Sequence, residues 1–267
     1  MTGSSDNAKE CSFTRAIVRP PSANFSTGLT TVDLGIPNHN LALTQHAAYC
    51  EALISCGLTL TTLPSDDVYP DSTFVEDAAI ITKRGAIITR PGAETRRGEI
   101  SSISSALSKY FKKLAVIEPP GTVDGGDVCE AGDHFFIGIS ERTNEAGANQ
   151  LSRFLWELDY SSELVDIRDV KGILHLKSGI AYLGGNKLVV IDALAGRERF
   201  LGYEMIKVDL SEEYAANCVA INGSVLIAAG FPMFEKRLRD HGYHTIPLEM
   251  SEFQKMDGGL SCLSLRF

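Results

Sequence analysis

The residue of this chain most suited to chemistry is Cys262, which follows the pair Gly258-Gly259 near the end of the sequence. Glycine reaches backbone angles that are closed to other residues, so a thiol after such a pair can be presented from a tight turn. A cysteine becomes a nucleophile when a base or a cation nearby favours its thiolate. A catalytic role for Cys262 therefore requires a proton carrier, a group that orients it and charged groups that hold a substrate.

One histidine and several carboxylates lie directly before segments that we expect to be strands. They are His175, the aspartates Asp124 and Asp127 around a Gly-Gly pair, and the acidic group Asp71, Glu76 and Asp77. An imidazole can carry a proton, and a carboxylate can orient the imidazole or hold a cation. Taken singly, each position has an ordinary alternative: a structural histidine, aspartates that cap a turn, or a solvated acidic loop.

Four arginines follow the first predicted hairpins, namely Arg90, Arg96, Arg97 and Arg142. A guanidinium is planar and pairs with a carboxylate through two parallel hydrogen bonds. One or two of these arginines could therefore hold a buried acid or the α-carboxylate of an amino acid. For most of them, a place on the surface is the alternative.

The elements that must position these residues recur as a hairpin followed by a helix. The expected hairpins, each of two short apolar strands joined by a turn, span 78–89, 128–139, 179–191 and 218–228. Helical spacing follows over 100–111, over 143–158 with Thr143 as the N-cap, and over 232–242. The N-terminal part adds a strand at 14–19 and a helix at 41–56, and a last strand at 262–266 could close the ring against it.

Five such units, each of roughly 50 residues, predict a single α/β domain over 1–267 with five-fold internal repetition, strands inside and helices outside. A doubly wound parallel sheet is the competitor, but hairpins before each helix fit it poorly. In a closed ring, equivalent positions meet at one end of the central channel, which would bring together Asp77, Asp124, His175 and Cys262. The long loop 20–40 is expected to be either a lid or a disordered excursion.

Composition narrows the classes of function. The chain has 267 residues, a net charge of −9 and 44% hydrophobic residues, which is ordinary for a soluble protein and unlike a nucleic-acid-binding one. The first ten residues are polar, with no charged-then-apolar start and no cleavage site, so we expect no signal sequence there. No apolar run approaches the ~20 residues that cross a bilayer. The six cysteines show no CxxC spacing. We therefore expect a cytoplasmic protein with reduced thiols that binds neither nucleic acid nor membrane.

Several segments resemble the dimethylarginine dimethylaminohydrolase family of guanidine-modifying enzymes, in the same order and at similar spacing. They are Phe74-Val75-Glu76-Asp77, Ile88-Thr89-Arg90-Pro91-Gly92, Asp124-Gly125-Gly126-Asp127, Ser140-Glu141-Arg142-Thr143-Asn144, His175-Leu176-Lys177-Ser178 and Asp257-Gly258-Gly259-Leu260-Ser261-Cys262. The resemblance spans nearly the whole chain. It implies a five-bladed α/β propeller with pseudo-five-fold repeats, strands lining a central channel and helices outside.

The resemblance also implies roles for individual residues. Cys262 is expected to be the nucleophile, His175 the general acid and base, and Asp124 the carboxylate that orients His175. The expected substrate contacts are Asp77 to the guanidinium nitrogens, Glu76 as a further pocket acid, Asp71 to the α-amino group, Arg96 and Arg142 to the α-carboxylate, and the backbone carbonyls of Leu29 and Met256. Arg90 and Arg97 compete with Arg96 for its role.

The mechanism implied by the resemblance is covalent. Cys262 attacks the guanidinium carbon, His175 protonates the departing amine, and a water molecule then releases citrulline from the sulfur. This scheme needs no metal and no organic cofactor. The substrate is a small guanidino or ureido amino acid, and a homodimer is left open because propellers of this kind occur as monomers and dimers.

The choice of substrate rests on a departure from a related family. Arginine deiminases resemble this scheme but place a second aspartate two residues after the histidine, where this chain has Lys177. Without that acceptor, the additional N–H donors of plain arginine would lack a partner, which favours methylated arginine. A citrulline ureidase or a deiminase-type hydrolase remains the alternative. A non-catalytic propeller that binds a macromolecule is the rival from another class, but such a protein would not need the Cys, His and carboxylate set.

Overall fold

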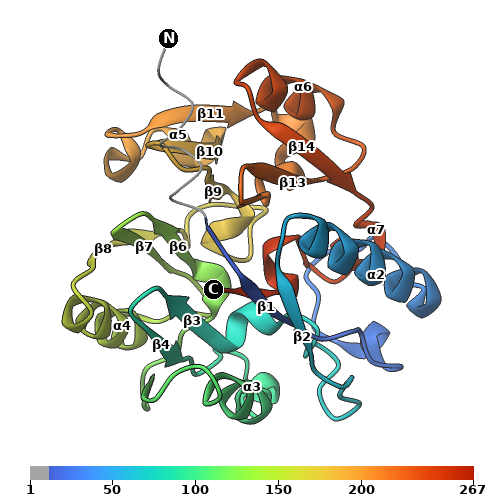
Figure 1. Ribbon diagram of the computed structural model, residues 1–267. Helices are drawn as coiled ribbons and strands as arrows, with labels where there is room; N and C mark the ends of the chain where they lie inside the picture. The colour runs from blue at the N-terminus through green and yellow to red at the C-terminus, as the bar shows by residue number, and fades with distance from the viewer. Residues whose placement is uncertain (1–11) are drawn as a thin grey trace.

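The computed structural model describes residues 12–267 and forms a ring of five small sheets around a central axis (Figure 1). The polar segment 1–10, for which we expect no signal sequence, and Cys11 lie outside the described residues. The larger helices lie at the periphery of the ring, and the C-terminus lies near its centre. The predicted five-bladed α/β propeller is confirmed.

Every sheet has three strands with one pattern of pairing: an inner strand runs antiparallel to a middle strand, which is parallel to an outer strand. The inner strands are β3 (Ala79–Thr82), β6 (Val128–Ala131), β9 (Ile180–Tyr182), β12 (Val219–Ile221) and β15 (Leu265–Arg266). The middle strands are β4 (Gly85–Ile88), β7 (His134–Ile139), β10 (Lys187–Ile191), β13 (Ser224–Ala228) and β1 (Arg15–Val18). The outer strands are β5 (Leu114–Val116), β8 (Ser161–Asp166), β11 (Glu204–Val208), β14 (His244–Leu248) and β2 (Thr59–Thr62).

The inner and middle strands are the predicted hairpins, and their turns carry the residues that tight turns require. Between β12 and β13, Asn222 and Gly223 both have positive φ, as a two-residue hairpin turn demands. The ring closes where β15 pairs with β1, so that Ala16 faces Arg266 and Ile17 faces Leu265. This closure confirms the expected pairing of the two terminal strands.

The helices connect the middle strand to the outer strand of a sheet. They are α2 (His39–Ser55), α3 (Ile100–Leu107), α4 (Glu145–Glu157), α5 (Asp192–Ala195) and α6 (Pro232–Asp240), and a short helix α7 (Ser251–Gln254) precedes the C-terminal segment. Buried residues recur at helical spacing on the inward side, for example Leu151 and Leu155 in α4. None of the helices within residues 12–267 is long and apolar enough to cross a membrane.

The helix boundaries differ from the predicted ones by a few residues, and two of these differences have a bearing on the prediction. Helix α4 is capped by Asn144, whose side chain accepts a hydrogen bond from the backbone N–H of Gly147 at 2.8 Å, and Thr143 lies one residue earlier. Thr143 is instead fully buried and does not cap the helix, because its hydroxyl accepts the backbone N–H of Asp124. Helix α3 ends at Leu107 instead of continuing to Tyr110 and Phe111.

A short 3-10 turn leads into the inner strand of each sheet, and these five turns gather at one end of the ring. They are η2 (Val75–Ala78), η4 (Gly125–Asp127), η5 (Leu176–Ser178), η7 (Leu210–Ala216) and η8 (Ser261–Leu263). Turn η2 contacts both η4 and η8, while η5 contacts η4 and η7. The predicted reactive residues lie in these turns or at their caps, so the repeat brings them together.

Candidate active site

A small cavity of about 30 Å³ lies at the end of the ring where the turns meet. Nine of the ten predicted site residues line it, and Glu76 is the exception. The complete lining is Leu29, Asp71, Phe74, Asp77, Arg96, Asp124, Arg142, Leu174, His175, Met256, Asp257, Gly258 and Cys262. A thiol, an imidazole, three carboxylates from the predicted set and two guanidinium groups therefore share one enclosure.

His175 is held by Asp124, the carboxylate predicted to orient it. The Nε2 atom of His175 lies 3.1 Å from Oδ2 of Asp124, and both side chains are buried. The other oxygen of Asp124 accepts the backbone N–H of Gly92 at 2.8 Å, which fixes the carboxylate. Gly126 leaves the room that the ring needs, since a Cβ there would lie 2.6 Å from Nδ1 of His175. The pair is thus fixed in both position and orientation.

The surroundings of His175 favour its protonated form. Burial alone would lower the pKa of the imidazole, but the nearby carboxylates of Asp77, Asp127 and Asp124 outweigh it and raise that pKa to about 9. His175 is therefore an imidazolium near neutral pH. A charged imidazolium can deliver a proton to a leaving group.

Asp77 is fixed in its ionised form. Its Oδ2 accepts from Nη1 of Arg96 at 2.6 Å, and its Oδ1 accepts the backbone N–H of Gly126 at 2.9 Å. Burial opposes the charge, but the positive groups of His175 and Arg96 hold the pKa of Asp77 below its usual range. A permanent negative charge therefore lies beside the thiol and the imidazole.

The two predicted arginines differ in how much of their donor capacity is free. Arg96 is buried, with its Nε and Nη2 donating to Glu99 at 3.0 and 2.8 Å and further bonds to Asp77 and to the carbonyls of Asp71 and Phe74. Arg142 is only half-buried, and its guanidinium has no hydrogen bond or ion pair with any residue of 12–267. Arg142 is thus ready to accept an anion, whereas Arg96 already ties the acidic residues of the site to one another.

Cys262 lies in turn η8 and is buried, with 8% of its surface exposed. Its backbone N–H donates to the carbonyl of Gly259 at 3.2 Å, and Asp257 ahead of it has a positive φ of 56°. Burial, followed by the charges of Glu76 and Asp77, raises the pKa of the thiol well above its usual value. Without a further positive charge, Cys262 is therefore a thiol.

Glu76 is the predicted site residue that the structure separates from the others. Its carboxylate lies 2.6 Å from Nζ of Lys177 and 3.0 Å from Nη2 of Arg266, and it accepts the hydroxyl of Ser261 at 2.7 Å. These partners line a second, larger cavity on the axis of the ring, to which Glu76 also contributes. Glu76 and Asp77 are consecutive residues of η2, so their side chains project toward opposite ends of the channel.

The long loop before α2 covers the small cavity, as the lid interpretation expects. The carboxylate of Asp71 accepts the backbone N–H of Leu29 at 3.0 and 3.2 Å, and Thr30 donates to the carbonyl of Lys255 at 3.0 Å. Met256 lines the cavity beside the lid. Burial is the main cause that raises the pKa of Asp71. Through its bonds to Leu29, Asp71 fastens the lid.

Two further residues position the reactive turns, and the sequence prediction gave them no role. Asn217 donates from Nδ2 to the carbonyl of Lys177 at 3.0 Å and to Oγ of Ser261 at 3.2 Å, while its Oδ1 accepts the backbone N–H of Ser261 at 2.9 Å. It thereby joins the turn after His175 to the turn that carries Cys262. Asp127 accepts the backbone N–H of Leu176 at 3.0 Å and so holds the histidine turn from the other side.

Both positions had a signal in the sequence. Asn217 precedes the inner strand of the fourth hairpin, which is the repeat position that supplies a reactive residue elsewhere. Asp127 belongs to the Asp-Gly-Gly-Asp segment already singled out. The repeat could therefore have identified them as candidates, although it could not have revealed which groups they contact.

Asp77, Asp124 and His175 could also present one ligand atom each to a cation, because these atoms lie within 4.8 Å of one another. In this structure the positively charged groups of Arg96 and His175 already lie beside the two aspartates. Arg96 donates to Asp77, and the raised pKa of His175 keeps the imidazole charged against Asp124. The cluster is thus balanced by the protein's own groups.

Comparison with known proteins agrees with this geometry. The family model described as arginine deiminase matches residues 66–215. The chain is 43% identical to N(G),N(G)-dimethylarginine dimethylaminohydrolase of Pseudomonas aeruginosa over 96% of this chain and 100% of the relative. It is 38% identical to the protein of the same name from Streptomyces coelicolor over 94% of this chain and 96% of the relative.

A solved structure gives the same result. A cysteine-to-serine variant of the Pseudomonas aeruginosa enzyme in complex with citrulline superimposes with a TM-score of 0.93 at 42% identity, covering 96% of this chain and 99% of that chain. Relatives with more than 30% identity over nearly the full length define a family, and the expected resemblance is confirmed. The chain therefore belongs to the dimethylarginine dimethylaminohydrolase family, a group of cysteine-dependent hydrolases.

Proposed function

We propose that this protein hydrolyses Nω-methylated arginine to citrulline and methylamine or dimethylamine, through a covalent adduct on Cys262. The observation that carries the proposal is the enclosure of a thiol, an imidazole bonded to a carboxylate, and a permanently ionised aspartate in one small cavity. The names of the two bacterial relatives and the citrulline in the solved structure support the same substrate class.

The substrate would bind with its guanidinium group against Asp77 and its amino-acid end at the lid. Asp77 offers fixed negative charge, and a guanidinium donates two parallel hydrogen bonds to a carboxylate. Arg142, which has no partner of its own within residues 12–267, takes the α-carboxylate. Asp71 and the carbonyls of Leu29 and Met256 receive the α-ammonium group, so that substrate binding and lid position depend on the same carboxylate.

The substrate itself would activate the nucleophile. In the free protein, burial and the charges of Glu76 and Asp77 keep Cys262 protonated. A guanidinium placed against Asp77 neutralises part of that negative field and adds a positive charge beside the sulfur. Both effects lower the pKa of the thiol, because an adjacent cation stabilises the thiolate. Cys262 then loses its proton only when a cationic substrate is in place.

The thiolate attacks the guanidinium carbon, and the C–N bond to the methylated nitrogen breaks as His175 donates its proton to that nitrogen. The alkylamine leaves, and an S-alkylthiouronium adduct remains on Cys262. The imidazole, now neutral, takes a proton from a water molecule that attacks the same carbon. The C–S bond breaks with its electron pair on sulfur, and citrulline carries the oxygen of that water. The proton that this oxygen loses as the carbonyl forms returns Cys262 to its thiol form. Asp124 holds the imidazole in place through both steps.

Lys177 supports a preference for methylated substrates. It stands two residues after His175, and its ammonium group pairs with Glu76 in the larger cavity. No carboxylate extends from that position toward the small cavity, so an unsubstituted guanidinium nitrogen would leave N–H donors unpaired there. A donor buried without a partner costs about 1–3 kcal/mol. Plain arginine is therefore the poorer substrate.

We further propose one catalytic domain over 1–267, a cytoplasmic location and assembly as a monomer or a homodimer. The cysteines within residues 12–267 are free thiols, which is typical of a reducing compartment. The five sheets form one continuous ring, which supports a single domain.

The test is to incubate the protein separately with dimethylarginine, monomethylarginine, arginine, agmatine and citrulline, and to measure citrulline, ornithine, alkylamine and ammonia. We expect citrulline and alkylamine in equal amounts from both methylated substrates, and little product from arginine or agmatine. Ornithine and ammonia from citrulline would replace this proposal with a ureidase. Ammonia from arginine at the rate of the methylated substrates would replace it with a deiminase.

A further inference from the structure

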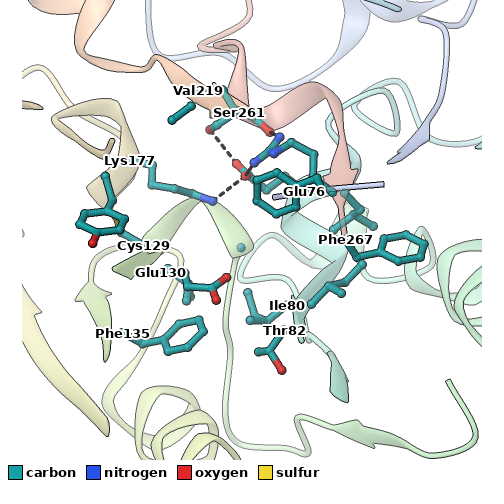
Figure 2. Close-up of a pocket in the computed structure, with 18 of the residues that line it drawn as sticks. Glu76, Ile80, Thr82, Cys129, Glu130, Phe135, Lys177, Val219, Ser261 and Phe267 are labelled. Carbon is teal, nitrogen blue, oxygen red and sulfur yellow. Dashed lines mark hydrogen bonds and ion pairs between the residues drawn. The ribbon is translucent and has the colours of Figure 1, made fainter. Parts of the chain in front are cut away.

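A second cavity, about 350 Å³ in volume, occupies the axis of the ring on the side away from Cys262. Residues of all five inner strands line it: β3, β6, β9, β12 and β15. Figure 2 shows that Glu76, Lys177 and Ser261 form one side of this cavity, with the carboxylate of Glu130 facing the interior from β6. The volume is in the range of small-molecule sites. We call this space the channel cavity.

The charges around Glu76 do not balance. Its single carboxylate is shared by two cations, with Nζ of Lys177 at 2.6 Å and Nη2 of Arg266 at 3.0 Å. The other terminal nitrogen of Arg266, Nη1, donates to the hydroxyl and the carbonyl of Ser264 and to the carbonyl of Ser261. The ammonium group of Lys177 makes no ion pair other than that with Glu76 within residues 12–267, so it keeps donors for a further partner. This side of the cavity therefore carries one excess positive charge.

Glu130 supplies the opposite charge. Its carboxylate makes no hydrogen bond or ion pair with any residue of the described part of the chain, although it points into the cavity (Figure 2). Burial is the main reason that the pKa of Glu130 is raised, to about 7, with the nearby Asp133 adding to it and Lys83, Lys177 and Arg266 opposing it. A buried carboxylate is stable in its ionised form only when a cation or several hydrogen bonds accompany it.

Apart from Lys83 and Asp133, whose charges act on Glu130, the rest of the lining is largely apolar or already bonded. Ile80, Phe135, Val219 and Phe267 present hydrocarbon and aromatic surface, and the hydroxyl of Thr82 donates to the carbonyl of Gly85 at 3.1 Å. A metal ion such as Ca²⁺ or Mg²⁺ needs six or more oxygen ligands. The group of metal-ligating residues found within 12–267 lies at the other cavity and does not include Glu130.

We propose that the channel cavity binds a small zwitterion, with the ammonium group of the ligand on Glu130 and its carboxylate on Lys177. A simple cation would meet the excess positive charge beside Glu76, and a simple anion would meet the carboxylate of Glu130. A molecule with both charges satisfies each side, and a short alkyl chain between them lies against the apolar wall. This site does not include Cys262, and it recognises a ligand by its two charges and by the apolar chain between them.

The experiment measures binding by isothermal titration and by ligand-observed NMR at pH 8, where Glu130 is ionised. The probes are γ-aminobutyrate, butylammonium and butyrate, which share one chain length and differ in charge, and shorter and longer ω-amino acids then test the span. We expect one of the zwitterions to bind at least about tenfold more tightly than the cation and the anion. Equal binding of butylammonium would overturn the proposal, as would no binding of any zwitterion up to about 50 mM.

Substitutions locate the site. Glu130→Gln keeps the shape of the side chain and removes its charge, and Lys177→Met removes the ammonium group. Each substitution should weaken binding of the zwitterion at least about tenfold, since each removes one charged partner. Arg142→Ala, in the small cavity, is the matched control and should leave this binding unchanged. Binding that survives both channel substitutions, or that is lost in Arg142→Ala, contradicts the site. Turnover is not measured in this experiment, so its failure would leave the proposed hydrolysis untouched.

Discussion

The two cavities on the axis of the ring are built from the same five repeats but differ in size and in how their charges are paired. The cavity at Cys262 has about 30 Å³ of space, and its acidic groups are tied to Arg96 and His175. The channel cavity has about 350 Å³, and Glu130 faces it without a partner within residues 12–267. The larger space is therefore not where the reactive groups are. What marks the reactive site is the mutual contact of groups with shifted pKa values.

Consecutive residues supply the two cavities. Asp77 and Cys262 line the small cavity, while their neighbours Glu76 and Ser261 line the channel cavity and bond to each other at 2.7 Å. The tight turns η2 and η8 present successive side chains in opposite directions. One structural repeat can thus serve two sites, although the charge of Glu76 still acts on the thiol of Cys262.

The largest expected effect is that of Cys262→Ser. Because a hydroxyl is a far weaker nucleophile than a thiolate, turnover of dimethylarginine should fall by about 10⁴-fold or more. Cys56→Ser, at the end of α2, is the control and should keep near-normal turnover with the same unfolding midpoint. Steady-state assays with purified proteins measure both. If Cys262→Ser retains a tenth of the activity, the site of the reaction lies elsewhere.

Arg96 and Arg142 line the same cavity, but their substitution should change different properties: stability for Arg96 and substrate binding for Arg142. Arg96→Ala leaves Asp77 and Glu99 buried without their cation, and the loss of one partner of a buried pair costs about 3–5 kcal/mol of stability. Arg142→Ala removes no side-chain hydrogen bond or ion pair within residues 12–267, so the stability of the variant should stay within about 0.5 kcal/mol of the original protein while KM rises. Urea unfolding and steady-state kinetics separate the two. Equal loss of stability in both variants would contradict the assignment of Arg96 as a structural tie.

Asp124→Asn should shift the pH dependence of the reaction. The carboxylates around His175 raise its pKa to about 9, so activity that needs the imidazolium is present below that value and is lost as the pH rises through it. Removing one negative charge destabilises the imidazolium and lowers its pKa. The alkaline limb of kcat/KM should therefore move to lower pH in Asp124→Asn, in addition to a lower maximum. A limb that stays in place, or moves upward, would show that His175 is not the group that titrates.

Asn217→Ala should lower kcat about 10- to 100-fold with little change in KM, because Asn217 holds the turns of His175 and Cys262 together without lining the small cavity. Asn222→Ala is matched to it, since Asn222 also makes three side-chain hydrogen bonds, to Phe13 and Cys56 at the edge of the ring. That control should lose stability and keep kcat. The rate at which a haloacetamidine alkylates Cys262 gives a second readout, and it should fall in Asn217→Ala alone.

The smallest effect concerns Glu130 in the channel cavity. Its pKa is raised from the ordinary 4.5 to about 7, so between these values the folded protein holds a proton that the unfolded chain has released. Stability should therefore fall as the pH rises through this window, and Glu130→Gln should remove that part of the loss. The variant gains stability relative to the original protein at pH 8 and shows no such gain at pH 4. Urea titrations at both values test this, and an equal difference at the two would mean that Glu130 has a partner.

Much of the architecture could be predicted from the sequence because its signals are local. The hairpins have β-branched strands and turns such as Asn222-Gly223, and the helices have buried residues at regular spacing. The five outer strands were not predicted. Segments such as β2 (Thr59–Thr62) and β8 (Ser161–Asp166) are short, polar and half-exposed, so only pairing with a middle strand makes them strands.

The site was predictable to the extent that it follows from the repeat. Equivalent turns bring Asp77, Asp124, His175 and Cys262 to one end of the ring, and the family resemblance supplied their roles. The direction of Glu76 could not be read from the sequence, because neighbouring residues in a 3-10 turn can face either cavity. The structural role of Arg96 could not be predicted either. It depends on a pairing with Glu99, and nothing in the sequence distinguishes Glu99 from the other polar residues around it.

The most direct test is to trap the reaction in progress. The protein is mixed with dimethylarginine, and the reaction is quenched in acid within the first turnovers. The protein is then digested, and the masses of its peptides are measured by mass spectrometry. The peptide that contains Cys262 should carry the substrate minus dimethylamine, and the signal should disappear once the substrate is exhausted. Steady production of citrulline with the Cys262 peptide unmodified at every time point, or with the adduct on a different cysteine, would contradict the account.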